Sequence, residues 1–173
     1  MNFIVSSSYL LKNLNAINGV ITSNPVVPIL DNVLFEIENG NLLITASDLQ
    51  TSVMVEIQVE SKKDGSAAIP AKILIDTLKN LPEQPVTFSI DDENYNIEIN
   101  SDNGRYKLVG ENATDFPKVP QVTDGYSIDL SSELLSNAIS NTIFSTSTDE
   151  LRPAMTGIFL KLSTSSCIFV STD

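Results

Sequence analysis

The 173-residue sequence contains no histidine and no tryptophan, and it contains only one cysteine. Histidine is the most common general base in enzymes and the most common metal ligand near neutral pH. Its absence weakens most hypotheses of acid–base catalysis or of a transition-metal site. Cys167 has no second cysteine to pair with, so no internal disulfide can form, and we expect it to be a small apolar core residue.

Long apolar runs and an amino-terminal targeting pattern are missing as well. No stretch approaches the roughly 20 apolar residues that a membrane-spanning helix needs. The first residues, MNFIVSSS, lack the basic segment followed by an apolar core that marks a secretory signal. We therefore expect a cytoplasmic protein without a membrane partner.

Basic residues are scarce, because ten Lys and Arg stand against 22 Asp and Glu and give a net charge of −12. Taken alone, this balance argues against binding to nucleic acid, whose phosphates repel an acidic protein. Net charge does not say where the basic residues lie, however, and a basic surface can exist within an acidic protein.

The clearest local pattern is a β-hairpin over residues 28–48, PILDNVLFEIENGNLLITASD. Val33, Phe35 and Ile37 alternate with residues of the opposite face, as they do in a half-buried strand. Asn39-Gly40 occupies the bend, where a type I′ turn requires positive φ at both central positions. The pattern predicts two antiparallel strands joined by a two-residue turn.

The same hairpin pattern recurs 125 residues later in the chain. Residues 153–173, PAMTGIFLKLSTSSCIFVSTD, keep the apolar positions of 28–48 in register without a gap. Upstream, residues 126–128 take the place of the amino-terminal strand. Ser7-Ser8 falls over Ser131-Ser132 at an offset of 124, which implies one residue gained before the second hairpin. A repeat of this length has the size of a domain.

A shorter repeat divides the first domain into two halves. Strand patterns at residues 3–5 and 67–69 each precede a helical pattern and three further strands, with a half-period of about 63 residues. This order predicts an α+β fold with the helices on one side of antiparallel sheets. We expect one complete domain at residues 1–122, the first part of a second at 123–173, and a natural chain that continues beyond Asp173.

Local signals place the ends of the two helices and strands. Ser7 or Ser8 can cap the first helix with a side-chain oxygen, and Pro70 suits the first position of the second. Residues 51–60 are typical of one strand, and residues 62–65 of a turn. The apolar stripes are Leu10, Leu11, Leu14, Ile17 and Ile21 in the first helix, and Ile73, Leu74, Leu78 and Leu81 in the second.

The outward faces of these helices differ from the rest of the chain in charge. They carry Lys12, Lys72 and Lys79 together with several asparagines, and Asp76 is the one acid nearby. The other acids concentrate on strands and turns. Such neutral or basic helix faces are what a surface turned towards DNA would need.

Several segments together resemble the bacterial beta sliding clamp, the beta subunit of DNA polymerase III. They are FIV at 3–5 followed by LLKNL, the 28–48 hairpin, AIPAK at 68–72, DFPKVP at 115–120, and LRPAMTGIFL at 151–160 followed by FVSTD. None is a catalytic motif, so the resemblance rests on their order and spacing along the whole chain.

The resemblance implies a DNA-clamp fold and a homodimeric ring around double-stranded DNA, with helices lining the hole and sheets outside. Each chain of such a ring has three of these domains. The implied partners are the DNA polymerase III catalytic subunit and the clamp loader. The implied function is processivity in DNA replication, with no catalytic residue, no metal and no cofactor.

The resemblance also implies three sets of site residues. The DNA-contacting positions correspond to Asn24, Lys72, Asp149, Pro153 and Ala154, of which only Lys72 is basic. The partner-peptide pocket corresponds in part to Arg152, Met155 and Thr172. The subunit interface of the first domain corresponds to Ile73, Thr77, Leu81 and Arg105.

Two other functions fit the residues considered without the resemblance. The first is a non-enzymatic adaptor or scaffold that binds peptides in a groove between domains. The second is a metal-dependent hydrolase that uses Asp91-Asp92-Glu93, since hard cations prefer carboxylate ligands. An acidic hairpin turn is more commonly a solvated surface feature.

Simpler structural roles stay open for the same residues. The helix lysines can be solvated charges, and Ile73 and Leu81 can be core residues. Arg152 can pin its loop to a carboxylate without touching a ligand. Asp48 and its counterpart Asp173 follow the two hairpins, where a structural role in a turn is expected.

Overall fold

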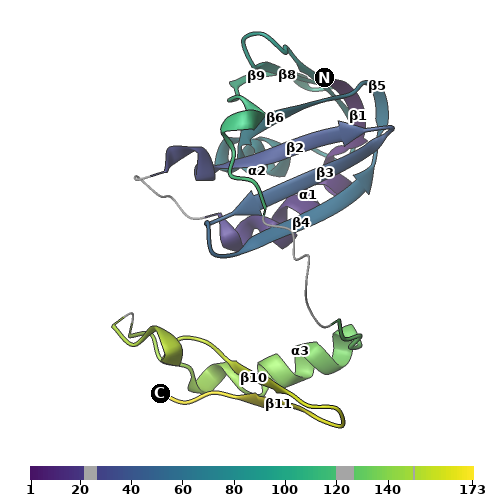
Figure 1. Cartoon of the computed structure of the whole chain (residues 1–173). Helices are drawn as coiled ribbons and strands as arrows, with labels where there is room; N and C mark the ends of the chain where they lie inside the picture. Colours follow the sequence, from purple (N-terminus) through teal and green to yellow (C-terminus); the bar gives the residue numbers. More distant parts are fainter. Residues whose placement is uncertain (22–26, 120–126, 150) are drawn as a thin grey trace. The chain divides into compact units, whose positions relative to one another are not determined.

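The computed structural model describes residues 1–21, 27–119, 127–149 and 151–173. The chain divides into two compact units, unit 1 at Met1–Pro120 and unit 2 at Gln121–Asp173 (Figure 1). The domain boundary predicted between residues 122 and 123 lies outside the described residues. Among the described helices, none is both long enough and apolar enough to cross a membrane.

The described residues of unit 1 form two antiparallel sheets and two α-helices. One sheet has four strands in the order β4-β3-β2-β6, at Ser52–Gln58, Asn41–Ser47, Asn32–Glu38 and Gly65–Pro70. The other has five strands in the order β5-β1-β7-β8-β9, at Glu60–Lys63, Asn2–Ser6, Pro85–Ile90, Asn96–Ser101 and Gly104–Val109. The helices, α1 at Ser7–Ile17 and α2 at Ala71–Lys79, pack against each other (Figure 1). The predicted α+β fold is confirmed.

Both sheets and both helices contribute to one main hydrophobic core. Phe3 of β1, Phe35 of β2 and Phe88 of β7 are fully buried, and the rings of Phe3 and Phe88 stack with centroids 4.8 Å apart. The helices add fully buried leucines, namely Leu10 and Leu14 of α1 and Leu74 and Leu78 of α2. The buried aromatic rings of the sheets and the leucines of the helices therefore pack into one core that joins both sheets to the helices.

The hairpin of β2 and β3 forms as predicted. Asn39 and Gly40 both have positive φ, 52° and 81°, and Glu38 pairs with Asn41 across the turn. Asparagine and glycine tolerate this left-handed conformation best, which explains why the bend falls there. The register places Phe35 opposite Ile44, and both side chains point into the core.

The helix starts differ by one residue from the prediction. Ser6 caps α1, because its Oγ accepts a hydrogen bond from the backbone N–H of Tyr9 at 3.4 Å. The predicted caps Ser7 and Ser8 both lie inside the helix, where Ser7 is buried and Ser8 is exposed. Pro70 precedes α2 as its N-cap residue and does not occupy its first position.

The apolar stripe predicted for α2 is partly wrong. Ile73 is 54% exposed, whereas Ile75 is buried. Residues on a helix follow each other at about 100°, so a buried face made of Ala71, Leu74, Ile75 and Leu78 turns position 73 outward. The stripe of α1 is confirmed at Leu10, Leu14 and Ile17, and Leu11 is half-buried. Ile21 is half-buried too, but it lies beyond the end of the helix at Ile17, so its place in the stripe was wrong.

The strand predicted at 51–60 is in fact two strands in different sheets. β4 ends at Gln58, and β5 begins at Glu60 and pairs with β1. The break falls at Val59, whose N–H donates to the carbonyl of Gly40 (2.9 Å). The turn predicted at 62–65 is therefore also wrong, because Lys62 and Lys63 belong to β5.

The described residues of unit 2 form one α-helix and one β-hairpin, with two short 3-10 helices between them. α3 spans Ser132–Ser140, and β10 (Phe159–Leu162) pairs with β11 (Cys167–Val170). Residues 127 and 128 form no strand, so the strand predicted at 126–128 is wrong at its described positions, and residue 126 lies outside them. None of the described residues of unit 2 is fully buried, and Cys167 is half-buried, contrary to its predicted core role.

The repeat itself is more regular than the sequence suggested. α1 starts at Ser7 and α3 at Ser132, and their caps are Ser6 and Ser131, so the offset is 125 at this point too. The short 3-10 helices that begin at Pro28 and Pro153 keep the same offset. No residue is gained between helix and hairpin, and the offset of 124 is wrong.

Candidate nucleic-acid interface

The outward faces of α1 and α2 carry the exposed lysines that the sequence singled out. Lys12, Lys72 and Lys79 are all exposed, and α1 contains no acidic residue. α2 contains one acid, Asp76, whose Oδ1 lies 3.8 Å from the Nζ of Lys79. Since such an exposed pair contributes little, this helix pair presents three lysines and one aspartate in a strongly acidic chain.

Part of this face is hollowed between the end of α1 and the side of α2. The cavity has a volume of about 390 Å³ and is lined by Asn18, Ile21, Asp31, Lys72, Ile75, Asp76 and Lys79. Two of the three lysines and an asparagine amide therefore converge there. Lysine is a point-charge donor suited to phosphate, but the two aspartates keep the lining electrostatically mixed.

The other predicted DNA-contacting residues lie elsewhere. Asn24 lies outside the described residues. Asp149, Pro153 and Ala154 come together in one loop of unit 2, in which Pro153 and Ala154 are exposed. None of these three is basic, and the one basic residue of the loop, Arg152, is paired with Asp149.

Arg152, predicted for the partner-peptide pocket, is held by its own loop. Its Nε donates to Oδ2 of Asp149 at 2.9 Å, which favours the simpler role of pinning the loop to a carboxylate. Met155 is half-buried, and its carbonyl accepts a hydrogen bond from Ser147 N–H (2.9 Å). Thr172 is exposed beyond the end of β11.

The predicted interface residues divide between a helix face and a sheet edge. Ile73 and Thr77 lie one turn apart on α2, and Thr77 Oγ1 donates to the carbonyl of Ile73 (2.7 Å). The exposure of Ile73 excludes a core role, whereas Leu81 is half-buried against the core. Arg105 lies on the edge strand β9, with its Nε 3.3 Å from Oε1 of Glu98.

The acidic turn Asp91-Asp92-Glu93 has structural contacts. Asp92 accepts hydrogen bonds from Lys63 and from the buried amino-terminal nitrogen of Met1, the latter at 2.8 Å. The Lys63 hydrogen bond first, and the terminal amine next, lower the pKa of Asp92 to about 2. Since both its oxygens already face cations, Asp92 has little to offer a metal. Within the described residues, no group of three or more His, Cys, Asp or Glu side chains could hold a metal ion.

Asp48 has the structural role in a turn that was predicted for it. Its Oδ1 accepts from the backbone N–H groups of Gln50 (2.9 Å) and Thr51 (2.6 Å). These two hydrogen bonds, with Thr51 contributing most, lower the pKa of the Asp48 carboxyl. Leu49, the residue that follows Asp48 in this turn, is exposed and has a positive φ of 76°.

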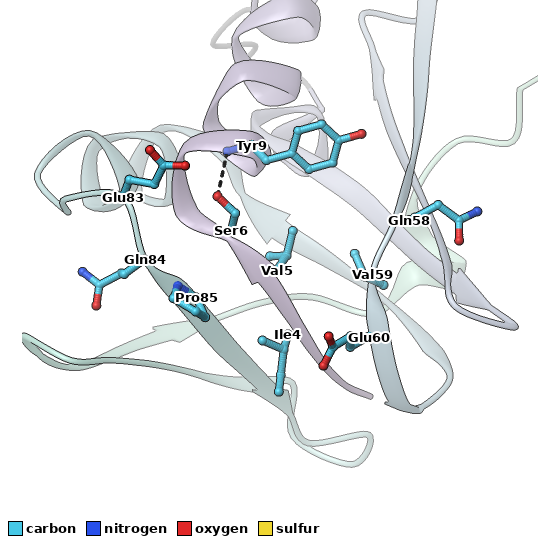
Figure 2. Close-up of a pocket in the computed structure, with 10 residues that line it drawn as sticks. All are labelled: Ile4, Val5, Ser6, Tyr9, Gln58, Val59, Glu60, Glu83, Gln84 and Pro85. Carbon is cyan, nitrogen blue, oxygen red and sulfur yellow. Dashed lines mark hydrogen bonds between the residues drawn. The ribbon is translucent and has the colours of Figure 1, made fainter.

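Sequence reasoning missed a second hollow, at the opposite end of α1. This cavity of about 580 Å³ is formed by the start of α1, by β1, by the β4–β5 crossing and by the loop before β7 (Figure 2). Its residues come from three separate stretches of the chain and form no local motif. Only the path of the chain between the two sheets brings them together.

A family model for the N-terminal domain of the DNA polymerase III beta subunit matches residues 1–120. The chain belongs to this family. A beta sliding clamp from Synechocystis sp. is 31% identical over 180 residues, covering 100% of this chain and 46% of that protein. The clamp from Staphylococcus epidermidis is 28% identical, with 100% of this chain and 48% of that protein covered.

Solved clamp structures agree with the fold. The sliding clamp from Bacillus subtilis is 26% identical and has a TM-score of 0.92, with 100% of this chain and 47% of that chain covered. A clamp from Bartonella birtlesii, solved bound to griselimycin, is 29% identical with a TM-score of 0.91 over the same shares of the two chains. This chain thus spans about half the length of the clamps it matches. The resemblance and the DNA-clamp fold are confirmed, whereas the individual site residues remain predictions.

Proposed function

We propose that this chain supplies part of a sliding clamp, a non-catalytic ring that encloses duplex DNA and tethers the replicative DNA polymerase. The match of residues 1–120 to the beta-subunit family carries the proposal. A closed ring gives processivity by topology, because it cannot leave a DNA molecule sideways. The contacts that this requires with phosphates are weak and carry no sequence information.

The distribution of charge supports the same function. The paired faces of α1 and α2 carry three lysines and one aspartate, although the chain as a whole has a net charge of −12. A mildly basic inner face would hold DNA loosely, and an acidic exterior would repel it. This division makes an acidic protein compatible with a DNA partner.

The finer assignments belong to this proposal. Partners would be double-stranded DNA, the DNA polymerase III catalytic subunit, the clamp loader and a second copy of the protein, in the cytoplasm. Lys72 would face DNA, whereas Ile73, Thr77, Leu81 and Arg105 would meet the second copy. Arg152, Met155 and Thr172 would belong to the pocket that binds partner peptides, with Arg152 also pinning its loop to Asp149.

Release from DNA that depends on topology is the decisive test. The full-length protein is loaded onto a nicked circular plasmid by the clamp loader, and retention is followed by gel filtration in high salt. We expect the protein to stay on the circle and to leave when a restriction enzyme linearises it. A complex that dissolves in salt and is indifferent to linearisation would refute enclosure and favour the peptide-binding adaptor.

A further inference from the structure

The cavity of about 580 Å³ beside the start of α1 has an apolar floor and an aromatic wall. Ile4 and Val5 of β1, Val59 and Pro85 form the floor. Figure 2 shows the ring of Tyr9 extending from the first turn of α1 towards the β4–β5 side. The Tyr9 side chain is 47% exposed, so its ring is available to a ligand.

Three of the six polar side chains that line the cavity already make hydrogen bonds. Gln84 Oε1 accepts from the backbone N–H of Asp102 (2.7 Å), and Gln58 donates to the side chain of Asn41. Ser6 Oγ accepts from the N–H of Tyr9. A ligand in the cavity would therefore find these three groups already hydrogen-bonded within the protein.

The free polar groups are all hydrogen-bond acceptors or can act as such. The carboxylates of Glu60 and Glu83 line the cavity, and neither makes an ion pair or side-chain hydrogen bond with any described residue. The Tyr9 hydroxyl is likewise without a partner among those residues. Among the described residues, no lysine or arginine lines the cavity. Its charge is therefore complementary to a cation that has several donors and an apolar stem.

We propose that this cavity binds an arginine side chain from an extended segment of a partner protein. A guanidinium presents five donors, forms bidentate pairs with carboxylates and stacks on aromatic rings. Glu60 supplies the carboxylate next to the floor, and Tyr9 supplies the ring. The methylene stem of the arginine lies on Ile4 and Val59.

The edge of a sheet makes an extended segment the fitting carrier for this arginine. Glu60 is the first residue of β5, and β5 is the end strand of the five-stranded sheet. An end strand leaves backbone N–H and C=O groups to which a further strand can add. A peptide laid along β5 would bring a side chain to the cavity at Glu60.

A titration of the full chain with two matched peptides tests the proposal. The probes are acetyl-Leu-Arg-Leu-amide and the same peptide with citrulline, which keeps the shape of arginine and removes its charge. Binding is followed by amide NMR shifts. We expect shifts at β1, β5 and the start of α1, and an affinity for the citrulline peptide lower by about tenfold, as the loss of a charge-assisted hydrogen bond implies.

Variants separate a built site from diffuse attraction to an acidic protein. Glu60→Gln and Tyr9→Leu should each weaken arginine-peptide binding by about fivefold or more. Glu56→Gln removes the same charge from an exposed position of β4 that does not line the cavity, and it should leave affinity unchanged. Equal losses in Glu60→Gln and Glu56→Gln, equal binding of both peptides, or shifts confined to another surface would overturn the proposal.

Discussion

Replacing Ser7 by Ala should destabilise unit 1 more than replacing either neighbouring serine. Ser7 is buried, its Oγ donates to the carbonyl of Pro82 (2.8 Å), and it accepts from the N–H of Gln84 (3.1 Å). Alanine would leave the buried N–H of Gln84 without a partner, whereas the Pro82 carbonyl would keep a long hydrogen bond from Gln84 Nε2 (3.5 Å). An orphaned buried group costs roughly 1–3 kcal/mol, so we expect a loss of about 2 kcal/mol in the free energy of unfolding.

The neighbouring serines provide matched controls for this prediction. Ser6→Ala removes the N-cap of α1, but its hydrogen bond to Tyr9 is long at 3.4 Å, so a loss of about 0.5–1 kcal/mol is expected. Ser8 is exposed, and within the described part of the chain its hydroxyl pairs with that of Ser6 alone, at 3.1 Å. Ser8→Ala should therefore change stability by no more than about 0.5 kcal/mol.

Urea unfolding of the full chain, followed by the amide NMR signals of β1 and β7, measures unit 1 alone. The urea concentration at the midpoint should be highest for Ser8→Ala, lower for Ser6→Ala and lowest for Ser7→Ala. The dependence of the unfolding free energy on urea concentration should be the same in all three. If Ser7→Ala proved as stable as Ser8→Ala, the two hydrogen bonds between Ser7 and the loop before β7 would not stabilise unit 1, and the prediction would be refuted.

Three further predictions concern acid stability, packing and DNA. Asp92, with a pKa of about 2 against an ordinary 3.8, stabilises the fold above about pH 4 and loses this effect as pH falls towards 2. Asp92→Asn should therefore lower the melting temperature at pH 7, and the difference from the parent should shrink as pH falls through 2. Gly110→Ala would place a Cβ 2.6 Å from a backbone oxygen of β6, and calorimetry should show a loss of about 3 kcal/mol. Gly19→Ala, with nothing within 4 Å of the new Cβ, should be near neutral. Lys72→Gln should reduce the slope of log affinity for duplex DNA against log salt by about 1, whereas Lys107→Gln on β9 should not change it.

Features governed by neighbouring residues could be predicted from the sequence. The Asn39-Gly40 turn, the buried face of α1 and the strands β7 to β9 follow from local conformational preference and periodicity. Each depends on residues within a few positions of one another. Local patterns suffice where the burial of one face and the turn chemistry agree.

Features fixed by distant segments could not be predicted. β4 ends before Val59 because the chain crosses there to the other sheet. The N–H of Val59 donates to the carbonyl of Gly40. Ser6 caps α1, and Ser7 does not, because the Ser7 hydroxyl hydrogen-bonds to Pro82 and Gln84 in a loop that is distant in the sequence. A window along the sequence does not contain these contacts.

The candidate sites show the same division. The exposed lysines of both helices follow from helical periodicity, and the structure places Lys72 and Lys79 at one cavity. The predicted pocket and interface residues came from resemblance alone, and the ion pair between Arg152 and Asp149 was foreseen only as a simpler alternative. No local sequence pattern predicts the cavity at Tyr9, because its walls come from separate stretches of the chain.

The sharing of strands between the two halves of unit 1 explains the contrast with unit 2. β6 of the second half completes the sheet of β2, β3 and β4, while β1 of the first half lies inside the sheet of β7, β8 and β9. Neither half can then close a core by itself. The elements of unit 2, α3 with β10 and β11, repeat only first-half elements, and none of its described residues is fully buried. Pairing of β1 with β7 should therefore couple the two halves of unit 1, so that a substitution that disrupts this pairing unfolds both halves in one transition.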